Sequence, residues 1–117
     1  MRTTIEECYN KVGADYKDVM KRFGSEDMVQ YFALKFLKDP SFSELCRAME
    51  QGDSELAFRS AHTLKGICLN LGFTPLYEVS TELTEKLRGR NTEGLADELA
   101  RVRKCYDHVI GTFCELC

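Results

Sequence analysis

The sequence has few of the features that mark several large classes of protein. No apolar run approaches the roughly 18 residues that a membrane span requires. Residues 1–7 contain no apolar core of the kind found in secretory signal peptides. No basic stripe stands out, and the net charge of −3 argues against nucleic acid as the main partner. We therefore expect a cytoplasmic protein that binds neither a membrane nor nucleic acid.

Patterns of repeated or extended structure are also missing. The chain shows no internal repeat, sustained heptad, low-complexity segment or linker, and nothing reads as a β strand. A Gly-rich phosphate-binding loop is absent, so we find no ATP-binding element. Among the 117 residues, 44% are hydrophobic and 30% charged, which is typical of an ordinary soluble globular protein. We expect one domain over residues 1–117 with a single core.

Six cysteines are present, a number that could form a disulfide framework in a secreted chain. The missing export signal argues against that interpretation. Cys46, Cys68 and Cys105 also occupy positions where helical spacing favours small apolar residues, and free cysteine packs well in protein cores. We expect all six thiols to be reduced.

Capping residues and glycines divide the segment between about residues 4 and 38 into short helices. The first begins with a capping-box pattern at residues 3–7, and Asp15 and Ser25 are candidate N-caps for the next two. Gly24 would end the second. The third has a broad, strongly aromatic apolar set, which predicts that it covers one end of a larger unit. That set comprises Met28, Tyr31, Phe32, Leu34, Phe36 and Leu37.

Four amphipathic segments follow between about residues 41 and 115. The connections between them are only a few residues long, and short connections make sequential helices antiparallel neighbours. The sequence therefore predicts an all-α protein, an up-and-down antiparallel four-helix bundle with additional N-terminal helices covering one end. The expected starts are a capping box at Ser41–Glu44 and N-caps at Asp53, Thr74 and Asn91.

The segment from Asp53 to Gly72 carries the most informative pattern. At about 100° per residue, one narrow stripe collects apolar side chains that must face a core. His62 lies roughly 150° from the centre of that stripe, so its imidazole should point to solvent. Lys65 and Gly66 are its neighbours on the helix surface. The stripe consists of Ala57, Ala61, Leu64, Cys68 and Leu71.

The surroundings of His62 are unusual for a solvent-facing surface. Phe58 and Leu69 flank it, although both lie off the apolar stripe. A glycine in mid-helix costs about 0.5–1 kcal/mol relative to alanine, which is reasonable only if clearance is needed there. These neighbours indicate a reaction carried out against another protein. Alternatively, Phe58 and Leu69 pack beneath adjacent helices, since globular helices bury a broad stripe.

The arrangement resembles the histidine-containing phosphotransfer (HPt) domain of multistep phosphorelays. The His-x-x-Lys-Gly pattern alone is weak, but it becomes fairly specific in mid-helix, on the solvent side and after suitable preceding helices. The resemblance runs from about Asp15 to the final helix. It is carried by the segments 22–24, 31–40, 52–53, 61–66 (Ala-His-Thr-Leu-Lys-Gly) and 71–72.

The resemblance implies a phosphorelay intermediate, which is a phosphocarrier and not an enzyme. His62 would accept a phosphoryl group from a receiver-domain aspartate and pass it to another receiver. Lys65 would compensate the charge of the phosphoryl oxygens, and Gly66 would leave clearance for the partner.

Partner docking would involve apolar and basic residues around the histidine. Phe58 and Leu69 would supply apolar area, and Arg59, together with Arg88 and Arg90, would favour an acidic pocket. The resemblance implies response-regulator receiver domains and a hybrid sensor histidine kinase as partners. It also implies a monomer without cofactor or metal of its own, the Mg²⁺ being supplied by the receiver.

Two other functions remain open from the sequence. One is a non-phosphorylated helical adaptor that binds receivers or kinases, although an adaptor has no need of the His-x-x-Lys-Gly triplet. The other is a thiol or metal module built on Cys114 and Cys117, with Cys105 and His108 nearby in sequence; structural zinc sites need four ligands. His108 otherwise reads as an ordinary surface residue.

Two further positions near the proposed site are not assigned a role in it. Some HPt domains carry a glutamine that hydrogen-bonds the histidine or the phosphoryl group, and by residue count this position falls on Thr84. We do not assign Thr84 to the site. Arg90 lies in the cation-rich end of its helix, where cations suit the helix dipole, and this explanation is preferred to a binding patch.

Overall fold

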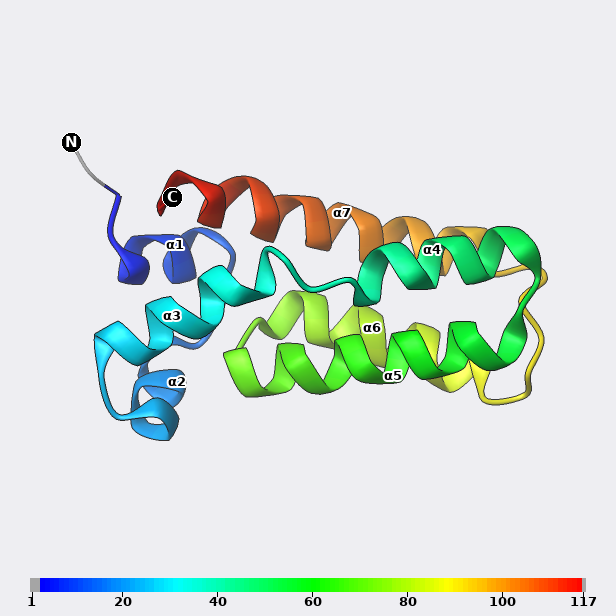
Figure 1. The fold of residues 1–117 in the computed structure, drawn as a ribbon, viewed down its shortest axis with the longest axis horizontal. Coiled ribbons are helices and arrows are strands. Elements are labelled where there is room, and N and C mark those ends of the chain that lie inside the picture. The colour runs from blue at the N-terminus through cyan, green and yellow to red at the C-terminus, as the bar shows by residue number, and fades with distance from the viewer. Residues whose placement is uncertain (1–2, 117) are drawn as a thin grey trace.

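The computed structural model describes residues 3–116, and every regular element within that range is helical (Figure 1). No described helix combines the length and apolar character needed to cross a membrane. The all-α class predicted from the sequence is confirmed. The elements are α1 (Ile5–Lys11), α2 (Tyr16–Phe23), α3 (Glu26–Phe36), α4 (Ser41–Gln51), α5 (Ser54–Leu71), α6 (Thr74–Leu87), α7 (Ala96–Phe113) and a short 3₁₀ turn, η1 (Cys114–Leu116).

Most helix starts follow the predicted caps. The side chains of Thr4, Asp15, Ser25 and Asp53 each accept a hydrogen bond from the backbone N–H three residues further on, at 3.1–3.2 Å. Thr4 also forms the complete capping box with Glu7. At the other ends, left-handed glycines stop α2, α4 and α5, as glycine allows without a steric cost. Local chemistry thus sets the length of these helices.

The predicted capping box at Ser41–Glu44 is wrong. Ser41 is the first helical residue and is buried, and its backbone N–H donates to the carboxylate of Asp39 at 2.8 Å. The Ser43 hydroxyl donates to the Pro40 carbonyl at 2.9 Å. Asp39 therefore satisfies an N–H that the sequence pattern had assigned to the serine motif.

Two other predicted starts are shifted. Thr74 is the first residue of α6 and not its cap, and its hydroxyl donates to the Gly72 carbonyl at 3.4 Å. Asn91 lies in the loop before α7, where its side chain accepts from the Glu93 N–H at 2.9 Å. The last helix begins only at Ala96, because Asn91 caps a turn within the loop.

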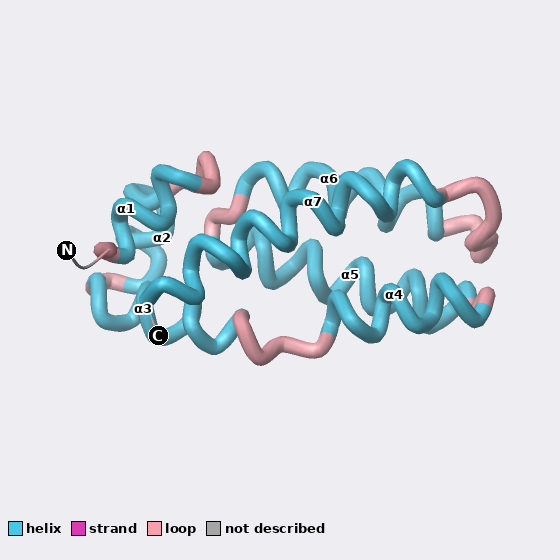
Figure 2. The backbone as a smooth tube through the Cα atoms, turned by 90° about the horizontal axis from the view of Figure 1, so that it is seen from above, coloured by secondary structure: helices cyan, strands magenta, loops and turns pink. Residues whose placement is uncertain are grey.

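Helices α4 to α7 run up and down beside one another and form the predicted four-helix bundle (Figures 1 and 2). The first and last helices of the bundle meet through Phe42 and Tyr106, whose rings stack with centroids 4.2 Å apart. Arg103 lies over Phe42 and donates to the Cys46 thiol at 3.3 Å. These contacts join α4 to α7 and so complete the bundle, in which α5 and α6 pack directly against each other.

Helices α1, α2 and α3 gather at the end of the bundle where α5 and α7 finish (Figure 1). Tyr9 is fully buried there, and its hydroxyl donates to the Leu71 carbonyl at 2.7 Å. This bond satisfies a carbonyl at the end of α5. Burial raises the pKa of Tyr9, so the phenol remains a donor. An aromatic cluster surrounds it, formed by Tyr16, Phe36, Phe73 and Phe113.

The inward face predicted for α3 is partly wrong. Phe36 is buried as expected, but Met28 is 42% exposed and Tyr31 is 58% exposed. The residues that α3 buries beside Phe36 are Val29 and Ala33. A helix with apolar side chains on most of its circumference can turn several faces inward, and packing against the bundle end selects one.

The cysteines of the described range form no disulfide. Cys8 and Cys68 are buried, Cys46 and Cys105 are half-buried, and Cys114 is exposed. Burial raises the pKa of the Cys68 thiol, which keeps it protonated. Five of the six thiols are therefore free in the structure, and Cys117 lies outside the described residues.

Candidate functional site

Helix α5 presents His62 to solvent. The predicted apolar stripe is buried along its whole length, with no member more than 4% exposed. Asp53 and Gly72 delimit α5 as predicted, so its 18 residues form one uninterrupted rod packed against α4 and α6. His62 lies on the opposite side and is exposed. The imidazole is thus held on a rigid support in reach of a second protein. The stripe is formed by Ala57, Ala61, Leu64, Cys68 and Leu71.

The two residues that follow His62 on this face leave an open surface. Lys65 and Gly66 are both partly exposed. A Cβ atom built on Gly66 would meet no atom within 4 Å, and the residue has ordinary helical backbone. Nothing inside the molecule therefore requires glycine at this position. Leu69, one turn further, is 53% exposed and continues the same face.

Phe58 lies on the other side of His62 and is only half exposed. Its ring is nearly parallel to the imidazole, at 18° with centroids 6.0 Å apart. The guanidinium of Arg90 covers the ring at 4.0 Å, and that of Arg88 lies 5.3 Å from its centroid. Arg90 has a positive φ of 61° and pairs with Glu55 at 2.7 Å. Phe58 is thus neither a core residue nor a freely exposed one.

These contacts also change the interpretation of Arg90. Helix α6 ends at Leu87, so Arg90 belongs to the loop after it and not to its final turn. Its partners are Glu55 and Phe58 of α5. The preferred explanation from the sequence, a helix-dipole cation, is wrong, because the loop folds back over α5.

Arg59 is exposed at the edge of α5 that faces α4. It borders a small polar depression that Ser60, Thr63 and Glu44 also line. Within residues 3–116 its guanidinium forms no salt bridge. Arg59 therefore adds a cation to the rim of the His62 face without contributing to a network inside the molecule.

Glu85 on α6 is the site residue that the sequence reasoning missed. Its carboxylate accepts two hydrogen bonds from Arg88, from Nε at 3.1 Å and from Nη2 at 2.9 Å. The pKa of Glu85 lies below its usual value, mainly because of these bonds, with further lowering by the charges of Arg88 and Lys65. The Glu85–Arg88 pair therefore lies next to Phe58, whose ring is beside His62. The only sequence signal was the Glu-x-x-Arg spacing, which places the pair on one helix face.

Thr84, the position where some family members carry glutamine, does not serve as a substitute. The residue is fully buried, and its hydroxyl donates to the Ser80 carbonyl of its own helix at 2.7 Å. Because the only hydroxyl proton is donated to Ser80 and the side chain is fully buried, Thr84 cannot donate to a group on the exposed face of α5. Its omission from the predicted site agrees with this geometry.

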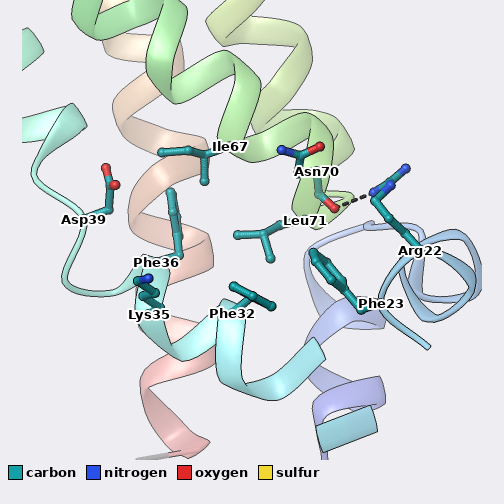
Figure 3. A pocket seen from close by; sticks show the side chains of 9 residues that line it. All are labelled: Arg22, Phe23, Phe32, Lys35, Phe36, Asp39, Ile67, Asn70 and Leu71. Atoms are coloured by element: carbon teal, nitrogen blue, oxygen red, sulfur yellow. Dashed lines mark hydrogen bonds between the residues drawn. The ribbon is translucent and has the colours of Figure 1, made fainter. Parts of the chain in front are cut away.

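An apolar groove of about 430 Å³ lies where α2 and α3 meet the end of α5 (Figure 3). Phe23 and Phe32 stack at its floor with centroids 4.9 Å apart. Arg22 closes one side by donating to the Asn70 carbonyl. The groove is separate from His62 and shares α5 with it. Its other lining residues are Lys35, Phe36, Asp39, Ile67 and Leu71.

The metal module that the sequence left open would use cysteines and one histidine near the end of the chain. Within residues 3–116 no group of three or more His, Cys, Asp or Glu side chains could hold a metal ion. His108 and Cys114 are exposed near the end of the chain, and the predicted thiol pair includes Cys117, which lies outside the described residues.

The structure is thus a helical bundle that displays a histidine, with a lysine and an open glycine position beside it, on the outer face of a central helix. The chain matches the family model described as the Hpt domain over residues 39–112, a range that contains α4 to α6 and most of α7. It belongs to the Hpt domain family. No curated protein and no solved structure matches the chain.

Membership in this family defines a general role. Hpt domains carry out histidine phosphotransfer in phosphorelays, and they are phosphocarriers that interact with receiver domains and kinases of two-component systems. The resemblance inferred from the sequence is thereby confirmed. The matched range begins at residue 39, so α1 to α3 lie outside it.

Proposed function

We propose that His62 accepts a phosphoryl group from a receiver-domain aspartate and later passes it to another receiver. A neutral imidazole nitrogen attacks phosphorus, a nitrogen–phosphorus bond forms and the bond to the aspartate oxygen breaks. The imidazole loses its proton, and the aspartate leaves as carboxylate. The reverse sequence on a second receiver completes the relay. Histidine suits this chemistry because its charge changes near neutral pH.

The exposure of His62 beside an open position is the observation that supports this proposal. The nitrogen has to reach an aspartate held inside a receiver pocket, so both protein surfaces must approach closely. A rigid α5 and the empty space at Gly66 permit that approach. In phosphoryl transfer the protein contributes mainly positioning and charge compensation.

The remaining predicted residues would serve docking. Leu69 offers exposed apolar area, and Arg59, which forms no salt bridge within residues 3–116, adds a cation. Phe58, which is partly exposed, would contact the partner as well. We propose that the chain acts as a monomer between a hybrid kinase and response-regulator receivers. The receiver would supply Mg²⁺ for the transfer.

The deciding experiment is incubation with a phosphorylated receiver domain. A phosphocarrier should gain a label that is lost in acid, as expected for a phosphoramidate, while the receiver loses its own. A non-phosphorylated adaptor would bind the receiver without gaining label. Binding without transfer, for every receiver that binds, would reject the proposal in favour of the adaptor.

Lys65→Ala should slow transfer about tenfold or more while weakening docking less. The ammonium group lies one turn from His62 and can compensate charge on the equatorial phosphoryl oxygens as it develops. Transfer rates and receiver affinity should both be measured, with Lys104→Ala on the exposed surface of α7 as a control. Equal losses in rate and affinity would assign Lys65 to docking alone.

Gly66→Ala should stabilise the fold by about 0.5–1 kcal/mol, because glycine is entropically costly in mid-helix and the new methyl group meets nothing. Gly66→Gln should slow transfer at least tenfold by obstructing the partner. Gly111 of α7 is a matched control, since a Cβ there also enters open space. Unfolding and transfer assays on the alanine and glutamine variants at Gly66 and at Gly111 separate an effect on stability from an effect on the approach of the receiver. Normal transfer by Gly66→Gln would contradict the clearance role.

A further inference from the structure

An acidic residue close to a phosphoacceptor requires an explanation. Glu85 pairs with Arg88 at 2.9 Å, and the Arg88 guanidinium lies 5.3 Å from the centroid of Phe58, whose ring lies beside His62. A phosphoryl group on His62 would bring about 1.5–2 negative charges to this surface, by analogy with other phosphorylated side chains. Glu85 would repel it. The argument that follows rests on the proposed phosphorylation of His62.

The partner of Glu85 is held in a way that permits exchange. Both members of the Arg88–Glu85 pair are more than half exposed, and such surface pairs contribute little to stability. Arg88 also lies 5.3 Å from the ring of Phe58, which itself stacks on His62. Only the Phe58 side chain therefore separates the Arg88 guanidinium from the His62 imidazole. The ion pair with Glu85 that holds the guanidinium is weak enough for a phosphoryl group to replace it.

We propose that Glu85 limits how strongly His62 retains its phosphoryl group by competing with that group for Arg88. The planar guanidinium fork suits phosphate and carboxylate oxygens equally well in geometry. The more highly charged phosphoryl group draws Arg88 away from Glu85. Glu85, left without its partner, then opposes the phosphorylated state. Such a balance suits a carrier that has to release what it accepts.

Arg90 is not expected to move to the phosphoryl group as Arg88 does. Its guanidinium covers Phe58 at 4.0 Å and bonds Glu55 at 2.7 Å, and its positive φ belongs to the fold-back of the loop. Each arginine has one carboxylate partner, but Arg90 lies closer to the Phe58 ring, at 4.0 Å against 5.3 Å, and also donates to the Arg88 carbonyl at 3.1 Å, so Arg88 is the less constrained of the two. This difference supplies a matched control, because Glu55→Gln removes the same charge from the same surface.

The first test is the equilibrium of phosphoryl exchange with a phosphorylated receiver. Glu85→Gln should shift the equilibrium toward phosphorylated His62 by about fivefold, the size expected when one surface charge near a dianion is removed. Glu55→Gln should shift it less than twofold. The effect of Glu85→Gln should shrink between 0.1 and 1 M salt, where screening lengths fall from about 10 Å to about 3 Å. No shift, or equal shifts for both variants, would overturn the proposal.

The role of Arg88 is tested by repeating Glu85→Gln in an Arg88→Gln background. If Glu85 acts by competition, its substitution should have a clearly smaller effect there. If Glu85→Gln shifts the equilibrium as much in the Arg88→Gln background as in the wild type, the proposed competition for Arg88 is wrong, because Glu85 then acts by direct repulsion alone. Helical content should be recorded for each variant; both side chains are exposed, so no loss of fold is expected.

A spectroscopic measurement tests the exchange without a receiver. In a His108→Gln background, phosphoramidate would serve as the chemical phosphoryl donor, and the Arg88 Nε–H signal would be followed by NMR. Phosphorylation should move this signal strongly and leave that of Arg90 in place. An unchanged Arg88 signal on a phosphorylated protein would overturn the inference. Failure of His62 to accept phosphate from any receiver would instead reject the proposed function, so the two failures are distinct.

Discussion

His62→Gln should abolish phosphoryl acceptance from a receiver domain while leaving the helical fold unchanged. Glutamine keeps a polar side chain of similar size but has no nitrogen that can act as the nucleophile. Since His62 is exposed and its ring lies beside only the half-buried Phe58, its replacement should alter the free energy of unfolding by no more than about 0.5 kcal/mol. Labelling should therefore disappear completely, a loss of more than a hundredfold, at unchanged stability.

The matched control is His108→Gln, which removes the other histidine of the chain. His108 is also exposed, on α7, and should not affect the labelling. Acid-labile phosphate and thermal unfolding should be measured for both variants with the same phosphorylated receiver. If His62→Gln still gains label and adding His108→Gln removes that label, the phosphoacceptor would be His108 on α7.

Gly72→Ala should destabilise the protein by about 3 kcal/mol. Gly72 has φ of +72°, where a side chain costs roughly 1–2 kcal/mol. A methyl group there would also overlap the Val19 side chain and lie 3.1 Å from the Asp15 carbonyl oxygen, and overpacking typically costs about 1–3 kcal/mol. Val19 is fully buried and cannot move aside freely. The substitution should thus separate α2 from the end of α5.

Gly24→Ala is the control for backbone strain. Gly24 has φ of +86° and also ends a helix, but a Cβ there would meet nothing within 4 Å. Its substitution should cost about 1–2 kcal/mol, the strain contribution alone. Denaturant unfolding of the two variants measures the difference. Equal costs would show that the contact between α2 and α5 adapts, and that the close approach at Gly72 is not rigid.

Local features of the chain were sufficient to predict the bounds of α5 and the exposure of His62. The 3.6-residue period identified the buried stripe, and Asp53 and Gly72 marked the two ends. Each of these signals acts within a few residues, because a cap satisfies its own helix and periodicity describes one helix at a time. The bundle topology followed from short connections for the same reason.

Predictions failed where two local signals competed. At the start of α4, Asp39 and Ser41 could each have satisfied the first backbone groups, and the acidic side chain does so. On α3, the aromatic set offered several possible inward faces, and packing at the bundle end left Tyr31 exposed and Val29 buried. In both cases the alternatives are nearly equal within the element, so contacts outside it decide.

The sequence by itself determined that a histidine, a lysine and a glycine share the exposed face of one helix, because these positions lie within two turns of the same rod. Only the tertiary structure decided which charges of α6 accompany them. The rotation and offset of α6 against α5 bring the Glu85–Arg88 pair to the Phe58 ring beside His62 and direct Thr84 into the core. These two quantities depend on side-chain packing along the whole helix interface, which no short stretch of sequence contains.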